Sequence, residues 1–123
     1  MNVLVPVDGS DNAMRAVIYA VFLAKENPNT QVTILSAIPP FTETRAGMAL
    51  EKARHAFVDA GLTVDAALVE GEPADTIIKY AQEHNMDNII IGHRGMGALK
   101  SMVLGSVSQK VLSKSNKPVT IIK

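Results

Sequence analysis

Residues 3–25 read VLVPVDGSDNAMRAVIYAVFLAK, and this stretch decides the fold class. Its first five residues are apolar throughout, which is typical of a strand buried on both faces of a sheet. A short polar turn follows, and the apolar residues of 11–25 then recur at helical spacing. A buried strand followed at once by an amphipathic helix is the repeating unit of an α/β fold.

The same alternation continues to the end of the chain. Strands are predicted at 3–7, 32–38, 64–69, 88–91 and 119–122, and helices at 11–25, 42–60, 73–85 and 106–115. Thr42 is the expected cap of the second helix, and Gly61 stands where a glycine commonly ends one. Right-handed crossovers then give a doubly wound, Rossmann-like parallel sheet of five strands, with four helices over both faces. No linker divides the sequence, so we expect one domain over residues 1–123.

Composition narrows the classes of function. The 123 residues include 12 Lys plus Arg and 12 Asp plus Glu, so the net charge is zero and we expect no nucleic-acid or membrane partner. The absence of Cys excludes a disulfide scaffold, thiol catalysis and Cys-ligated metals. The apolar run at the amino terminus is too short for a signal peptide, and no stretch is long enough to cross a bilayer. We therefore expect a cytoplasmic protein.

Three segments at predicted strand ends carry chemistry, since ligands of doubly wound sheets bind beyond those ends. Asp8 can accept hydrogen bonds from a ribose or help hold a phosphate-bound metal, and either it or Ser10 can instead cap the next helix. Residues 92–97, GHRGMG, suit a backbone anion site or a flexible loop. Gly105 and Ser106 open the last helix, whose N–H groups favour an anion.

The common catalytic and phosphate motifs are absent from the sequence. There is no Walker A sequence, no dinucleotide fingerprint, no Gly-x-Ser-x-Gly and no His-Glu-x-x-His. His55 and His84 fall in helical patterns and are expected at the surface. His93 stands beside the glycine-rich loop without an evident partner. We therefore predict no catalytic residue.

The spacing Gly92-x-x-Gly95, nine residues, then Gly105-Ser106 resembles the nucleotide motif of the universal stress protein family. The segment PVDGS at 6–10 resembles the opening of that family, and GEPA at 71–74 resembles its third helix start. The ending from Gly105 to Val119 is similar to its last helix and strand. The resemblance covers essentially the whole chain in the family's order.

This resemblance implies the strand order 3-2-1-4-5, with the first and fourth strands side by side. It implies ATP or AMP as ligand, with Mg or Mn held through the phosphates and Asp8 near the ribose or the metal. It puts the backbone of Ala37 at the adenine edge. The segment 39–42 is shorter than in many family members, which suggests a more open site. The candidate nucleotide-binding residues are Pro6, Val7, Asp8, Ser10, Ala37, Gly92, Arg94, Gly95, Gly105, Ser106 and Val107.

Three functions are compatible with these residues. The chain is a nucleotide-binding regulator of stress responses that acts through occupancy and dimerisation, a slow ATPase, or a protein-interaction module with a vestigial pocket. We expect the first, because the glycine motif is intact and no residue stands in a motif for activating water. The last strand, Val119-Thr120-Ile121-Ile122, is an apolar sheet edge. Family members often dimerise there, so we expect a homodimer that signals to a further partner.

Overall fold

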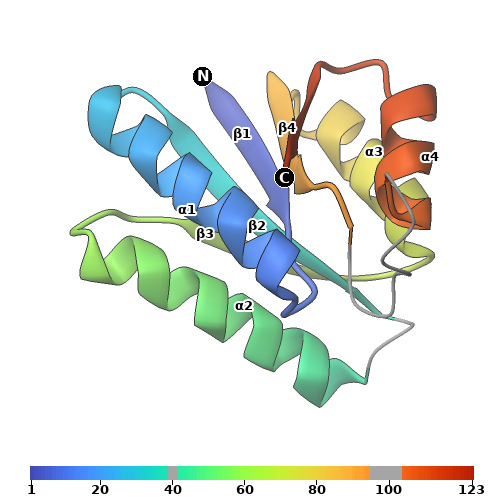
Figure 1. The fold of residues 1–123 in the computed structure, drawn as a ribbon, viewed down its shortest axis with the longest axis horizontal. Helices are drawn as coiled ribbons and strands as arrows, with labels where there is room; N and C mark the ends of the chain where they lie inside the picture. Colours follow the sequence, from blue (N-terminus) through green and yellow to red (C-terminus); the bar gives the residue numbers. More distant parts are fainter. Residues whose placement is uncertain (39–41, 95–103) are drawn as a thin grey trace.

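The computed structural model describes residues 1–38, 42–94 and 104–123. Five strands and four helices alternate along those residues, as predicted (Figure 1). They are β1 (Asn2–Pro6), α1 (Asp11–Glu26), β2 (Gln31–Ile38), α2 (Glu43–Asp59), β3 (Asp65–Glu70), α3 (Pro73–Glu83), β4 (Asn88–Gly92), α4 (Ser106–Lys114) and β5 (Val119–Ile122). The observed ends lie within one or two residues of the predicted ones.

All neighbouring strands pair in parallel, in the order β3-β2-β1-β4-β5. This is the order that the resemblance implies. The chain builds outward from β1 through β2 to β3, returns to the other side of β1 at β4, and ends at the β5 edge. The direction of winding therefore reverses between β1 and β4, and this is where ligands of doubly wound sheets bind.

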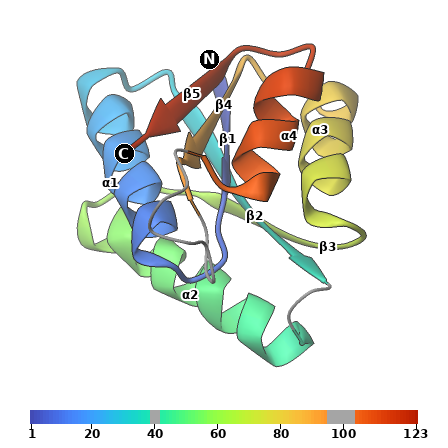
Figure 2. The ribbon, with the colours of Figure 1, turned by 45° about the vertical axis from the view of Figure 1, so that its right-hand side comes forward.

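Two apolar cores form on opposite faces of the sheet because strand side chains alternate in direction. On one face, Val3 and Val5 of β1 pack against α1 and α2. On the other face, Leu4 packs against α3 and α4. Figure 2 shows these two helical layers with the sheet between them. No helix in the described residues is both long and apolar enough to span a membrane.

The helix starts differ in how they are capped. Ser10 caps α1, Thr42 caps α2 and Glu72 caps α3, each with a side-chain oxygen that accepts a backbone N–H of the first turn. The cap residue of α4 is Gly105, which has no side chain for this purpose. Within the described residues, the first N–H groups of α4 are therefore left without a side-chain cap.

A polar cluster ties α3 to α4. The Lys110 ammonium lies 3.3 Å from a Glu72 carboxylate oxygen and 3.0 Å from Asp75. The backbone N–H of Asp75, followed by that of Ala74 and the Lys110 side chain, holds the pKa of Glu72 below its usual value despite partial desolvation. Asp75 and Glu72 together raise the pKa of Lys110. The cluster thus fixes α4 beside the first turn of α3.

Candidate functional site

The turn after β1 is held by its own side chains. The Oδ1 atom of Asp8 accepts the backbone N–H of Ser10 at 2.9 Å, and Gly9 between them has a φ of +85°. The Ser10 hydroxyl accepts the N–H of Ala13 at 3.1 Å. The sequence left open which residue caps the helix. The structure assigns the cap to Ser10, while Asp8 fixes the turn and stays partly exposed.

Strand β2 extends past the end of β1. Pro6 and Val7 are buried, and the Val7 N–H donates to the Leu35 carbonyl at 2.8 Å, one residue beyond β1. The Ile38 carbonyl faces the other side, where it accepts the N–H that follows β3 at 2.7 Å. Because successive groups of a strand alternate in direction, the N–H and C=O of Ala37 face the space beyond β1. That backbone edge offers one donor and one acceptor.

Gly92 allows β4 to touch the first turn of α1. A Cβ atom placed on Gly92 would lie 2.6 Å from the carbonyl oxygen of Asn12 and 2.8 Å from its carbon. Both are backbone atoms, so a side chain there would force the helix away from the strand. The sequence pattern indicated a backbone anion site or a flexible loop after this strand, and the structure adds a packing reason for this glycine.

Hydrogen bonds hold the start of α4 against the end of β4. The Gly105 N–H donates to the His93 carbonyl at 2.7 Å, and the Ser108 hydroxyl donates to the Gly92 carbonyl at 2.7 Å. Ser106 remains exposed, and Val107 packs against the α3–α4 core. Ser108 was missed by sequence reasoning, because its only signal is a position one turn after Gly105.

The partner of His93 is its neighbour. The Arg94 Nε–H donates to His93 Nε2 at 3.0 Å. An accepting imidazole nitrogen carries no proton, so the Nδ1 atom is the protonated one. That atom is buried without a hydrogen-bond partner in the described structure. The pair holds the Arg94 guanidinium at the end of β4, and Gly95, the next candidate, lies outside the described residues.

These elements meet at one place. β1 and β4 are neighbours, Gly92 contacts α1, and Ser108 of α4 bonds to Gly92. The Asp8 turn, the backbone edge of Ala37 and the uncapped start of α4 thus border the carboxyl edge of the sheet. Exposed N–H groups at a helix start stabilise an anion. Among the described residues, no group of three or more His, Asp or Glu side chains is placed to hold a metal.

This combination defines the class of protein: a doubly wound α/β protein whose last helix starts without a side-chain cap where the sheet reverses direction. The sequence model described as "Universal stress protein family" matches residues 1–123. The chain belongs to the universal stress protein family.

Individual relatives match this chain over nearly their whole lengths. Universal stress protein YxiE of Bacillus subtilis is 31% identical, over 98% of this chain and 97% of the relative. The universal stress protein from Archaeoglobus fulgidus in complex with dAMP superposes with a TM-score of 0.82 at 28% identity, covering 100% and 98% of the two chains. A universal stress protein in complex with cAMP has a TM-score of 0.81 at 27% identity, covering 100% and 97%.

Proposed function

We propose that this chain is an adenine-nucleotide-binding universal stress protein, a regulator that acts through the occupancy of its site and through dimerisation. The observation that carries the proposal is the uncapped start of α4, fixed by 2.7 Å hydrogen bonds against the end of β4 and close to the turn that holds Asp8. The complexes of related proteins with dAMP and cAMP support an adenine nucleotide. We propose ATP or AMP as the ligand, bound by one cytoplasmic domain over residues 1–123.

The phosphates would lie at the start of α4. The N–H groups of Ser106 and Val107, with the Ser106 hydroxyl, would donate to them, and Gly105 leaves room for the closest approach. Arg94 and Gly95 would complete this cradle from the β4 side. Each hydrogen bond to a charged oxygen contributes about 1.5–3 kcal/mol. Three such bonds contribute about 4.5–9 kcal/mol before the ordering cost, so contacts of the nucleoside must add to them to reach micromolar affinity, about −8 kcal/mol.

The nucleoside would lie across the end of β1. Asp8 would accept the ribose hydroxyls or hold Mg or Mn through the phosphates, and the Ser10 hydroxyl keeps a proton to donate. The N–H and C=O of Ala37 would pair with the adenine edge. Pro6, Val7 and Gly92 would form the floor, where small or flat groups allow the ligand to approach the backbone.

Calorimetry with ATP, AMP and cAMP, with and without Mg, tests the site. In Ser106→Glu, a carboxylate would occupy the phosphate position, while a negative charge at a helix start stabilises the helix itself. Ser106→Gln is the neutral control of equal size. We expect affinity at least tenfold lower in Ser106→Glu than in Ser106→Gln, with unfolding no easier. Equal affinities, or no heat from any nucleotide, would refute the proposal. Hydrolysis lost in Asp8→Ala would instead favour an ATPase.

The dimer is proposed to form through β5. The Pro118 and Ile122 carbonyls accept N–H groups of the β4 side, so the alternate groups of Val119 and Ile121 face outward at the sheet edge. Thr120 lies between them and bonds to Asn88 within the chain. An antiparallel second copy would satisfy the outward groups.

Analytical ultracentrifugation tests this edge. We expect the unmodified protein at twice the chain mass of 13.1 kDa. Ile121→Pro removes the outward N–H and should give monomers. Ile121→Ala also loses the isoleucine side chain but keeps the N–H, so it should still dimerise. A monomeric unmodified protein at micromolar concentration would contradict the proposal.

A further inference from the structure

A cavity of about 270 Å³ opens at the amino ends of the strands, at the opposite edge from the proposed nucleotide site. Its floor is polar. Asn2, Gln31 and Asp65 are the first residues of β1, β2 and β3, and Thr33 lies two positions into β2. The strand register pairs Asn2 with Gln31 and Thr33 with Asp65. Four polar side chains therefore lie next to one another on the face of the sheet that elsewhere packs its apolar residues against α3 and α4.

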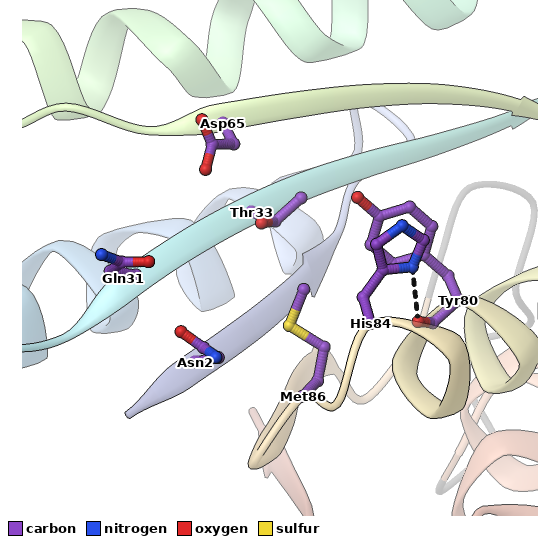
Figure 3. A pocket seen from close by; sticks show the side chains of 7 residues that line it. All are labelled: Asn2, Gln31, Thr33, Asp65, Tyr80, His84 and Met86. Carbon is purple, nitrogen blue, oxygen red and sulfur yellow. Dashed lines mark hydrogen bonds between the residues drawn. The ribbon is translucent and has the colours of Figure 1, made fainter.

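The wall of the cavity comes from the end of α3 and the connection to β4. The rings of Tyr80 and His84 stack with centroids 3.8 Å apart, inclined by 13°. The His84 Nδ1 atom lies 3.1 Å from the Tyr80 carbonyl, which fixes the imidazole on the tyrosine ring. Met86, almost fully buried, adds its thioether. Figure 3 shows the stacked rings and Met86 across from the strand residues.

Charge in this cavity is negative. Asp65 supplies a carboxylate, and neither Lys nor Arg lines the cavity, so His84 is the lining residue that can carry a positive charge. α3 ends at Glu83 with His84 as its cap residue, and the carboxyl end of a helix carries partial negative charge. The pKa of Tyr80 is raised by burial and further by Asp65, so its hydroxyl stays protonated at neutral pH. These fields favour a cation.

Two hydroxyl groups in the cavity make no hydrogen bond within the described residues. Thr33 is only 8% exposed, and its hydroxyl makes no hydrogen bond within the described residues. The Tyr80 hydroxyl also makes no hydrogen bond within the described residues. A hydroxyl oxygen can accept hydrogen bonds, so both can accept from the N–H groups of a bound cation. Neither oxygen is fully buried, so a ligand that supplies donors can reach both of them.

We propose that this cavity binds a small aliphatic amine through its ammonium group. The Asp65 carboxylate neutralises the ammonium, and the oxygens of Thr33 and Tyr80 accept its remaining N–H groups. The methylene chain lies against Met86 and the tyrosine ring. A cavity of about 270 Å³ has room for a short diamine. The site lies at the other end of the strands from the nucleotide site and does not depend on it.

Tyrosine fluorescence provides the test. The chain has two Tyr and no Trp, so in Tyr19→Phe the emission comes from Tyr80 alone. Titration of this variant with 1,4-diaminobutane should change the emission and saturate, whereas the neutral 1,4-butanediol should give no such change. Adding Asp65→Asn should weaken diamine binding at least tenfold. Adding Glu70→Gln, at the far end of the same strand, should leave it unchanged.

Calorimetry separates this site from the nucleotide site. Asp65→Asn should bind ATP and AMP as the unmodified protein does. Thr33→Val keeps the shape of the side chain and should also weaken diamine binding. This second variant tests the site even if the Asp65 variant folds poorly. The proposal is overturned by an absence of saturable binding, by equal affinity in Asp65→Asn and Glu70→Gln, or by binding of the diol as tight as that of the diamine.

Discussion

The contact between Gly92 and α1 leads to a prediction about stability. In Gly92→Ala the new Cβ would lie 2.6 Å from the Asn12 carbonyl oxygen, whereas ordinary contact begins at 3.4 Å. The two backbones must therefore separate by about 0.8 Å. Overpacking of this kind costs about 1–3 kcal/mol. For a chain of 123 residues, a loss of 2 kcal/mol lowers Tm by about 8 °C.

Gly47→Ala is the matched control. Gly47 lies inside α2, and a Cβ there would meet no atom within 4 Å. Alanine in a helix interior is better than glycine by roughly 0.5–1 kcal/mol, so this variant should be more stable than the unmodified protein. Urea denaturation and thermal unfolding followed by circular dichroism measure both variants.

The direction of the two changes is the test. If Gly92→Ala unfolds within 0.5 kcal/mol of the unmodified protein, the close approach of β4 and α1 is not what requires a glycine there. If both variants are equally destabilised, the effect is not specific to that contact. Gly92→Ala should also weaken nucleotide binding, since it displaces the helix that follows the Asp8 turn.

Three further predictions concern single hydroxyl and carboxyl groups. Ser108→Ala removes the 2.7 Å bond to Gly92 and should cost about 1–2 kcal/mol in urea denaturation, while the exposed Ser113→Ala should change stability by less than about 0.5 kcal/mol. Ser36 is buried and its hydroxyl has no partner in the described structure. Ser36→Ala should therefore raise the unfolding free energy by about 1 kcal/mol, and a variant that unfolds more easily than the unmodified protein would contradict this. Glu72→Ala removes the α3 cap and should cost about 1 kcal/mol at pH 7. Because the folded-state pKa of Glu72 is lowered, its contribution is complete above the usual value of 4.5 and is lost as pH falls through the folded pKa. The two proteins should therefore converge in stability as the pH is lowered below the folded pKa, and a constant difference would argue against the assignment.

Much of the fold could be predicted from local patterns. The strands of β1 and β4 are apolar on both faces, and the helices show apolar residues at helical spacing, so each element is visible without its neighbours. Thr42 and Gly61 mark the ends of α2 in the structure as predicted, the latter with a φ of +75°. The strand order came from the resemblance, because a pattern of apolar residues does not say which strands are adjacent.

The contacts within the site could not be predicted in the same way. Gly92 meets Asn12 from the other end of the chain, and only the packing of α1 on the sheet brings them together. His93 and Arg94 are adjacent in sequence, yet their hydrogen bond depends on rotamers that no sequence pattern specifies. Asn2, Gln31 and Asp65 each look like an ordinary polar residue before a strand. Their common cavity is a consequence of strand register.

The net charge of zero says little about ligands in such a fold. In a parallel sheet with helical crossovers, helix starts gather at the carboxyl edge of the strands and helix ends gather at the amino edge. Here the uncapped start of α4 borders the first edge, and the end of α3, with Asp65 nearby, borders the second. The partial charges of the helix ends have opposite signs at the two edges. The same chain direction that favours a phosphate at one edge therefore favours an ammonium at the other, and each ligand is selected by local backbone polarity.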